Sequence, residues 1–549
     1  MTKFLSRARF VILFVTLATP FGQPMAQTVR DTLAIISLND FHGAFVESND
    51  IPGAGNVYTV ISNLKKRYPA NIVLSAGDNF GGSYFSILTN GRLLPSYFSD
   101  LGIRYSAIGN HEFDKGQKFL NTFGRDTIQY LCSNVFNEKT SELLSCAKPS
   151  VLVDVKMPDN IIMKIGIIGI IEAEAKNQTK AINVSELSFS DDYANLLKQA
   201  SDTLATHGAD LQILLAHVGT VMESNEKVRW TNKSVTEKLE SLPNTIKGIV
   251  SGHSHQVVCG KMYRNIPVVQ GGISGKYIGV LRFAYDRQNN TLTPVDPMVV
   301  KTAKCQDGSA GRIKNDNTIG EICSNMKIES IDLYLNDTLA YVNDTIMHSR
   351  NDNTRPTMLG TYVCMAYADA YRRVKGLADT TPVLAFSHFG SIRRSLWPGF
   401  ANALTIGELL PFSNNLRVYM MKGKDIFKLI EAGIHNPFGC IQMNNLVVDT
   451  LSFNNNVRVL NVYYNLPGRA SVALSKNQFY PVVVDEYVAS GGDNYPKTLF
   501  PKEWDETISL DGTTDSFLKF MKKIYYEKKE PLSSRSPLKA RLKYYRDDY

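Results

Sequence analysis

Apolar runs of strand length alternate with amphipathic stretches between residue 31 and about residue 285. The strand-length runs are TLAIISL, NIVLSA, RYSAIG, IIMKIGIIGI, LQILLA and IKGIVS. Between them, stretches such as AGNVYTVISNLKKRY and DDYANLLKQASDTLATHG place their apolar residues on one helical face. Strands that alternate with helices predict an α/β domain.

The periodic pattern then lapses, and the chain resumes with a different arrangement. Residues 301–318 are polar, a helical pattern follows them, and a second mixed region begins near Arg350. A chain of 549 residues is also too long for one hydrophobic core. We therefore expect a first domain over residues 28–318, a bridging linker helix over 319–345 and a C-terminal mixed α/β domain over 346–549.

The start of the chain has the layout of a secretory signal peptide. A basic beginning with Lys3, Arg7 and Arg9 precedes the apolar run FVILFVTLA, and QPMAQ offers a cleavage point after Ala26. That run is too short to span a membrane, and the polar C-terminal sequence SPLKARLKYYRDDY lacks the hydrophobic tail of a lipid-anchor signal. We expect residues 1–26 to be removed, and the mature protein to be secreted and extracellular without a membrane anchor.

Composition and charge narrow the class of protein without deciding it. With 44% hydrophobic and 20% charged residues, the chain is an ordinary globular protein. Its formal net charge of +8 is spread along the sequence, apart from a Lys/Arg-rich final thirty residues. Such an excess could attract anionic substrates, but it does not argue for nucleic acid as a partner.

Seven cysteines and six N-x-S/T sequons are compatible with export. Cys132 and Cys146, and likewise Cys305 and Cys323, are close enough in sequence to close local loops in an oxidising compartment. The odd count leaves at least one cysteine unpaired, and the lack of a CxxC pattern argues against structural zinc. A glycoprotein is possible, although chance alone yields about as many sequons.

Five of the predicted first-domain strands end in a metal-binding type of side chain. These residues are Asp40 and His42, Asp78, Asn110, His217, and His253 and His255. Loops at the carboxyl ends of strands in an open α/β sheet converge on one crevice, so the seven side chains should meet there. A single such residue would mean little, but donors after five of the six predicted strands are hard to explain by structure alone.

The number and spacing of these donors favour a two-metal site. Asp40/His42 and His253/His255 are i, i+2 pairs, which point to one side of an extended chain and can chelate. Seven donors exceed the ligand set of one tetrahedral zinc with its water. They suit two divalent cations roughly 3.5–4 Å apart that share a bridging carboxylate. Because cysteine is not among the ligands, zinc, manganese, magnesium and calcium all remain open.

The motifs NDFHG, AGDNFGGS, GNHEFDKG, AHVG and SGHSH, in this order, resemble the calcineurin-like metallophosphoesterase domain of the 5'-nucleotidase/apyrase family. The resemblance covers essentially the whole mature chain. It implies a four-layer α/β/β/α sandwich, followed by a C-terminal nucleotide-binding domain. It also implies that extracellular nucleotides (ATP, ADP or AMP) are the substrates.

The resemblance assigns roles to the first-domain residues. One metal would be held by Asp40, His42, Asp78 and His255, and Asp78 would bridge to a second metal held by Asn110, His217 and His253. His111 would be no ligand: it would stand over the phosphate and stabilise charge developing in the transition state. Asp114 would hold the His111 ring in the right tautomer.

The second half of the chain matches the family less closely. By resemblance, Phe412 and Tyr487 would sandwich the base, and Asp493 of GGD would bind the ribose. In AFSHFGSIRRSLW, Arg393 aligns with the arginine of the family's phosphate loop.

Other positions in that phosphate clamp depart from the family pattern. His388 and Phe389 replace an Asn and a Gly. Met358 stands where several relatives have a second phosphate-binding arginine, and Arg350 or Arg355 could substitute for it. Arg394 is expected to face elsewhere.

The leading interpretation is a secreted, metal-dependent nucleotide phosphohydrolase that releases orthophosphate. The lack of an anchor signal and the altered clamp make the chain most similar to the salivary apyrases of blood-feeding arthropods, which inhibit platelet aggregation by destroying ADP. One alternative is a host-interaction protein of the same fold that blocks a platelet receptor or fibrinogen without turnover. Another is a phosphodiesterase or nucleotide-sugar hydrolase on the same scaffold.

Overall fold

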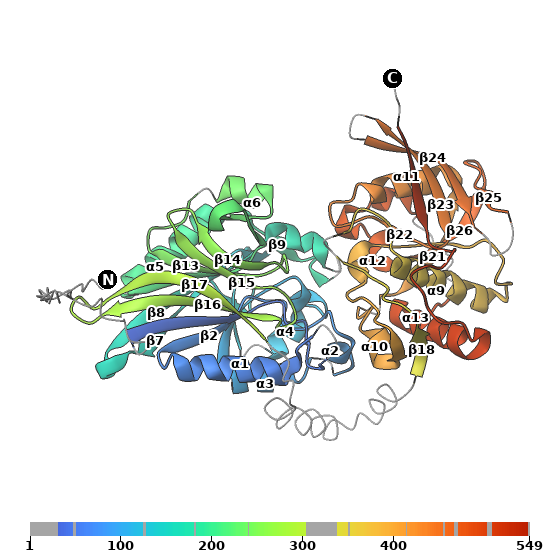
Figure 1. The fold of residues 1–549 in the computed structure, drawn as a ribbon. Helices are drawn as coiled ribbons and strands as arrows, with labels where there is room; N and C mark the ends of the chain where they lie inside the picture. Colours follow the sequence, from blue (N-terminus) through green and yellow to red (C-terminus); the bar gives the residue numbers. More distant parts are fainter. Residues whose placement is uncertain are drawn as a thin grey trace, which may run out of the picture.

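The protein consists of two domains that lie side by side (Figure 1). The computed structural model describes residues 31–47, 51–89, 91–123, 128–179, 183–239, 241–302, 338–349, 352–412, 414–453, 456–465, 470–501 and 508–546. The expected signal peptide, residues 319–337 of the expected linker helix, Cys305, Cys323 and Arg350 lie outside the described residues.

Two β-sheets packed face to face form the centre of the first domain. One sheet contains β1 (Thr32–Leu38), β2 (Asn71–Ser75), β3 (Ile103–Ala107), β4 (Gln129–Leu131), β6 (Ala147–Lys148), β16 (Tyr277–Asp286) and β17 (Thr291–Lys301) in the order β17-β16-β1-β2-β3-β4-β6. The other contains β7 (Ser150–Lys156), β8 (Ile162–Ile171), β10 (Leu211–His217), β13 (Ile246–Ser251), β14 (Val257–Met262) and β15 (Ile266–Gly271) in the order β14-β15-β13-β10-β8-β7. Apolar side chains of both sheets, such as Ile35, Leu74, Ile165 and Leu215, are buried in one core between them.

Helices cover the two outer faces of this pair of sheets. The helices of the first domain are α1 (Gly53–Arg67), α2 (Tyr84–Leu88), α3 (Leu94–Leu101), α4 (Gln117–Phe123), α5 (Tyr193–Thr206) and α6 (Lys233–Lys238). Ile61 of α1 packs in the core on the outer face of the first sheet, and Leu197 of α5 packs in the core on the outer face of the second. The four layers therefore run α/β/β/α, which confirms the predicted sandwich.

Short elements decorate the first domain. Two small antiparallel pairs, β5 (Val135–Asn137) with β9 (Leu187–Phe189) and β11 (Thr220–Met222) with β12 (Val228–Trp230), flank the main sheets. Two 3-10 turns follow strands of the sandwich, η2 (His111–Phe113) after β3 and η4 (Ala173–Gln178) after β8.

The second domain is mixed α/β. Its two four-stranded sheets have the orders β21-β26-β19-β22 and β25-β24-β23-β27. The strands are β19 (Leu384–Ser387), β21 (Leu416–Lys422), β22 (Gln442–Met443), β23 (Leu446–Phe453), β24 (Asn456–Tyr464), β25 (Val472–Ala473), β26 (Phe479–Asp485) and β27 (Arg541–Arg546). The helices are α9 (Met358–Lys375), α10 (Ala403–Gly407), α11 (Gly423–Ile434), α12 (Glu486–Ala489), α13 (Thr513–Lys522) and the π-helix η10 (Lys523–Lys528). Side chains of α11 share one buried core with residues of both sheets.

The chain enters the second domain as a strand, where the sequence predicted the end of the linker helix. β18 (Thr338–Val342) pairs antiparallel with β20 (Gly399–Asn402). Leu339 and Val342 are buried in the second-domain core, so tertiary packing overrides the helical pattern of this segment. Among the described residues, no helix combines the length and the apolar character needed to cross a membrane.

Cys132 and Cys146 are separate thiols in the structure. Cys132 follows β4 and Cys146 precedes β6, and these strands pair with Tyr130 opposite Ala147. The two cysteines thus lie at opposite ends of the paired residues.

Candidate active site

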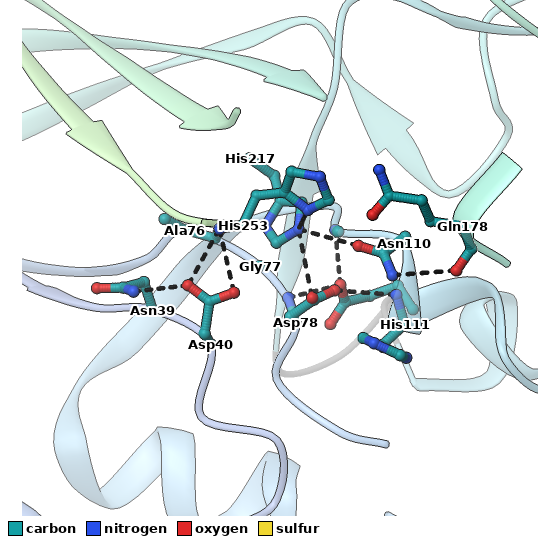
Figure 2. A network of polar contacts seen from close by, with 12 residues as sticks. Asn39, Asp40, Ala76, Gly77, Asp78, Asn110, His111, Gln178, His217 and His253 are labelled. Carbon is teal, nitrogen blue, oxygen red and sulfur yellow. Dashed lines mark hydrogen bonds and ion pairs between the residues drawn. The ribbon is translucent and has the colours of Figure 1, made fainter. Parts of the chain in front are cut away.

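The seven predicted metal donors come together at one edge of the sandwich, where strands of both sheets end. Figure 2 shows five of them, namely Asp40, Asp78, Asn110, His217 and His253. Six of the seven form two groups, in each of which one candidate ligand atom per residue lies within 4.8 Å of the others. The first group contains Asp40, His42, Asp78 and His255, and the second contains Asp78, His217 and His253. Asp78 belongs to both groups, as a bridging carboxylate must.

The first group is closely spaced around two imidazole nitrogens. His42 Nε2 lies 3.2 Å from His255 Nε2. His42 Nε2 also lies 3.9 Å from Asp78 Oδ2, and His255 Nε2 lies 3.4 Å from Asp40 Oδ1. Four donor atoms therefore face a common point.

The second group is centred on His217, and Asn110 joins it. His217 Nε2 lies 3.4 Å from Asp78 Oδ2, 3.3 Å from Asn110 Oδ1 and 3.2 Å from His253 Nδ1. The Asn110 amide nitrogen donates to the carbonyl of Gln178 at 3.3 Å, which leaves its oxygen turned toward His217 (Figure 2). All seven residues that the sequence predicted are thus brought together.

The backbone at these residues is unusual. The φ angle is positive at Asp40 (47°), His42 (52°), Asp78 (53°), His253 (75°) and His255 (58°). Our expectation that the i, i+2 pairs chelate from extended chain is therefore wrong. Left-handed turns at successive donors aim the side chains inward instead, in a conformation that persists only where the surroundings enforce it.

Hydrogen bonds fix the orientation of the donors. His217 Nδ1 donates to the Ala76 carbonyl at 2.8 Å, so Nε2 is the nitrogen available to a cation. Asp40 Oδ2 accepts from Asn39 Nδ2 at 2.6 Å and from the His253 amide at 3.1 Å (Figure 2). The cluster is preorganised before any cation enters it.

The chemistry of this donor set fits two divalent cations. Burial raises the pKa of Asp40 to about 6 and holds the pKa of His42 well below its usual range. The His42 and His255 Nε2 atoms lie 3.2 Å apart, so both imidazoles can turn a lone pair toward one cation. Asp78 is shared by both groups and can serve a second cation as well.

Two buried glutamates support the cluster, and the sequence analysis missed both. The Glu112 carboxylate is fully buried and accepts hydrogen bonds from the amides of Asp78 (2.9 Å), Asn79 (2.9 Å) and Gly109 (2.6 Å). It thereby ties the loop after β2 to the loop after β3, and burial raises its pKa to about 7. Its place directly after His111 in GNHEFD was the available signal.

Glu172 follows β8, the strand to which the sequence analysis assigned no donor. Its Oε1 accepts from Asn232 Nδ2 at 2.7 Å, and its Oε2 lies 3.9 Å from His253 Nε2, on the side of the ring away from His217. Burial raises its pKa. A carboxylate in this place can orient a metal-binding imidazole, and the same strand-end rule would have found it.

His111 and Asp114 form a pair beside the cluster. His111 Nδ1 lies 2.8 Å from Asp114 Oδ2, and the His111 amide donates to Asp78 Oδ1 at 2.9 Å. Burial lowers the pKa of His111, but the negative charges of Asp114 and Asp78 outweigh it and the net pKa is raised. His111 belongs to neither group of candidate ligands.

A cleft of about 820 Å³ runs between the domains and reaches the cluster. Its lining from the first domain includes Asn110, His111, Asp114, Glu172 and His253, and its lining from the second includes His388, Arg393, Phe412, Tyr487 and Asp493. The predicted catalytic and substrate-binding residues therefore share one cleft.

Arg393 and Phe412 reach across the cleft to the first domain. Arg393 Nη2 lies 3.5 Å from His42 Nε2, and the guanidinium carbon lies 5.4 Å from the centre of the Phe412 ring. Phe412 stacks on His111 with ring centres 5.2 Å apart and planes 8° apart. These residues bring the second domain directly onto the metal cluster.

Tyr487, Asp493 and His388 line the cleft together. The Tyr487 hydroxyl donates to Asp493 Oδ1 at 2.8 Å, and its ring centre lies 4.6 Å from that of His388. His388 Nδ1 lies 3.7 Å from Asp485 Oδ2, which is fully buried. Burial lowers the pKa of His388, but Asp485 and then Asp493 raise it, and the net pKa is raised.

The phosphate-clamp expectations for Met358 and Arg355 do not match the structure. Met358 is only 3% exposed, packs in the second-domain core and is not among the cleft residues, whereas Asn353 is. Met358 is the first residue of α9, and its side chain faces the second-domain core. It therefore cannot contact a phosphate in the cleft. Arg355 is exposed and lies outside the cleft lining.

Comparison with protein families accounts for this arrangement. The calcineurin-like phosphoesterase model matches residues 33–257, and the model of the 5'-nucleotidase C-terminal domain matches residues 338–499. Together the two matches span more than half of the chain. The chain belongs to the 5'-nucleotidase/apyrase family.

Relatives within the 5'-nucleotidase/apyrase family are distant in sequence but similar over most of the chain. A cell wall protein of Listeria monocytogenes is 24% identical, over 95% of this chain and 71% of its own length. An apyrase of Aedes aegypti is 24% identical, over 84% of this chain and 85% of its own. The structure of a 5'-nucleotidase precursor from Thermus thermophilus superimposes with a TM-score of 0.73 at 20% identity, covering 93% of this chain and 99% of that one.

Membership of the 5'-nucleotidase/apyrase family explains the cluster and the cleft together. The chain is a metal-dependent nucleotide phosphohydrolase, with a dinuclear site on the first domain. The second domain corresponds to the family's C-terminal domain, and its side chains face that site across the cleft.

Proposed function

We propose that the protein is secreted and releases orthophosphate from extracellular ATP, ADP or AMP. One observation carries this proposal: Arg393 of the second domain reaches within 3.5 Å of His42 in the first-domain metal cluster. The guanidinium of Arg393 and the cations of the cluster would both attract an anion that lies between them. A phosphate group can bind to both.

The metal ligands follow from the two groups of donors. Asp40, His42, Asp78 and His255 hold one cation, and Asp78, Asn110, His217 and His253 hold the other. Two bound divalent cations supply Lewis acidity to phosphate oxygens and lower the pKa of a water molecule. Glu112 and Glu172 keep the ligand loops and the His253 ring in place.

His111 acts on the phosphate rather than on the metals. Asp114 accepts a hydrogen bond from His111 Nδ1 at 2.8 Å, which fixes the ring and leaves Nε2 available to a ligand in the cleft. The Asp114 carboxylate beside Nδ1 favours the protonated ring, which can donate from Nε2 to the phosphate oxygens. The ring then stabilises negative charge that develops in the transition state.

The second domain grips the rest of the nucleotide. Arg393 binds the phosphates, Phe412 and Tyr487 stack on the base, and Asp493 accepts hydrogen bonds from the ribose hydroxyls. Each aromatic stack contributes roughly 1–3 kcal/mol, by analogy with single-strand binding. Phe412 must then exchange its contact with His111 for one with the substrate, and its partial exposure in the cleft supports this.

The biological setting rests on the first 26 residues and on the similarity to the Aedes aegypti apyrase. In that setting, hydrolysis of ADP outside cells would inhibit platelet aggregation in a host. The competing hypothesis is a protein that blocks a platelet receptor or fibrinogen without turnover.

A phosphate-release assay tests the proposal. The purified protein is treated with a chelator and then assayed on ATP, ADP, AMP and UDP-glucose with added Ca²⁺, Mg²⁺, Mn²⁺ or Zn²⁺. We expect metal-dependent release from at least one of the three nucleotides. Cleavage of UDP-glucose to UMP and glucose 1-phosphate, without phosphate release from the three nucleotides, would favour the nucleotide-sugar alternative. Platelet inhibition without any hydrolysis would favour the binding protein.

A further inference from the structure

Arg394, which the sequence analysis expected to face elsewhere, is held at the boundary between the domains. Its Nε and Nη2 donate to Glu408 Oε2 at 3.1 Å and 2.8 Å, and the two side chains are 15% and 12% exposed. The other Glu408 oxygen, Oε1, accepts from the backbone amide of Phe85 in α2 at 3.0 Å. One carboxylate therefore joins a second-domain arginine to the backbone of the first domain.

The surrounding packing makes this contact close. Gly407, directly before Glu408, lies against the Tyr84 ring of α2, and a Cβ at this position would overlap that ring. Leu404 of α10 packs in the first-domain core. The α10 segment is thus seated on α2, and Glu408 follows it immediately (Figure 1).

On the first-domain side, the contact continues to the metal cluster. The Ser83 hydroxyl donates to the Gly43 carbonyl at 2.8 Å, and Gly43 is the residue after His42. Gly82 lies against the His42 ring so closely that a Cβ there would overlap it. The start of α2 is therefore fastened to the loop that carries His42.

On the second-domain side, the contact continues to the phosphate-facing arginine. The Arg393 amide donates to the carbonyl of Leu409, the residue after Glu408, at 3.0 Å. The Arg393 side chain then reaches to 3.5 Å from His42 Nε2. The contacts of Glu408 on the first-domain side and on the second-domain side therefore both lead to His42.

We infer that Glu408 is a positioning residue, which holds Arg393 at the metal cluster by binding Arg394 and the Phe85 amide at once. This inference rests on the proposed role of Arg393 in binding phosphate. Without the Glu408 charge, Arg394 is left largely buried and unpaired, and the side chain at position 408 no longer joins Arg394 to the Phe85 amide of α2. The share of molecules with Arg393 in place then falls, and the apparent affinity for nucleotide falls in proportion.

Two variants test the inference. Glu408→Gln keeps an acceptor for the Phe85 amide but removes the charge, and Arg394→Met keeps the apolar stem without the guanidinium. We expect either to raise KM for the nucleotide that the wild type hydrolyses by about 10-fold, with kcat changed by less than about threefold. The double variant should be no worse than the single ones, because both remove the same interaction.

Structural readouts separate positioning from a general loss of fold. Small-angle scattering should show a larger radius of gyration in both variants, while bound metal and the melting temperature stay close to the wild type. Lys519→Met is the matched control, since it breaks an exposed second-domain ion pair with Asp511 (2.7 Å) and should change nothing.

Several outcomes would overturn the inference. They are unchanged KM in folded variants, additive losses in the double variant, or a KM change of the same size in Lys519→Met. If Glu408→Gln does not fold, Arg394→Met decides alone. If the wild type hydrolyses no nucleotide, the proposed function fails, and the scattering comparison then decides whether Glu408 joins the domains.

Discussion

The two walls of the cleft are built in different ways. On the first-domain wall, donors such as Asp40 and His217 are fully buried and sit at the ends of central strands. On the second-domain wall, Arg393, Phe412 and Tyr487 are partly exposed and come from turns and short helices. One wall is held by the sandwich itself, whereas the other depends on how the second domain is seated.

This difference separates two tasks. A site for two cations tolerates little movement, because each donor must stay within a fraction of an ångström of its place. Substrate binding requires entry and exit, which a wall on a separate domain allows. We therefore expect changes on the first wall to remove metal or chemistry, and changes on the second wall to alter KM.

Among changes on the first-domain wall, Asp78→Asn should have the largest effect on phosphate release and on bound metal. The bridging position requires a carboxylate, so a neutral amide should abolish phosphate release and lower the bound metal. Metal content by elemental analysis and phosphate release check this together. Asp202→Asn, which alters an exposed ion pair with Lys198, serves as the control. Near-normal activity in Asp78→Asn would exclude the two-metal site.

His111→Ala separates chemistry from metal binding on the same wall. Loss of one transition-state donor should lower kcat by roughly 10²–10³-fold, while metal content stays nearly unchanged. Steady-state kinetics and elemental analysis on one preparation are sufficient. Loss of metal in proportion to activity would mean that His111 is a ligand.

Arg393→Ala tests the second wall. Removing one charge-assisted hydrogen bond of roughly 1.5–3 kcal/mol should raise KM by roughly 10- to 150-fold and leave bound metal unchanged. KM for ADP and AMP is the measurement. Arg417→Ala is the control, because Arg417 pairs with Glu486 and does not line the cleft. A purely kcat effect would contradict the division between the walls.

The smallest expected effect is that of His388→Asn, which should change how the melting temperature depends on pH. Its pKa is raised in the folded state by Asp485 and Asp493, against burial and the charge of Arg393, with the Tyr487 ring beside it. A raised pKa stabilises the fold fully below the unfolded value of about 6.5, and this stabilisation is lost as pH rises through the folded pKa. The melting temperature of the wild type should therefore fall relative to His388→Asn as pH rises above about 6.5. Parallel curves for the two proteins would contradict this.

The first wall could be predicted from the sequence almost completely. Its donors follow apolar strand runs directly, and the convergence of strand ends needs no long-range information, as Asp78 and His217 illustrate. The backbone conformation was not predictable: extended chain was expected at Asp40 and His42, where φ is positive. Local sequence does not reveal a conformation that the packing of neighbouring loops imposes.

The second wall could be predicted only in part. Arg393, Phe412, Tyr487 and Asp493 do line the cleft, but Met358 lies in a core. The pairing of Arg394 with Glu408 and Phe85 joins residues far apart in the chain, which no periodic pattern shows. Contacts between separate domains depend on the shapes of both, and these emerge only after each has folded.

The left-handed turns at five of the metal donors have a thermodynamic consequence. An unfolded chain rarely visits these conformations, so the cations bind the native state far better than the unfolded one. Binding to the native state alone adds about 2.7 kcal/mol of stability when free metal is a hundredfold above Kd. The protein's resistance to heat is therefore partly a property of its surroundings, and a preparation that has passed through a chelator is less stable than the same chain in a metal-rich fluid.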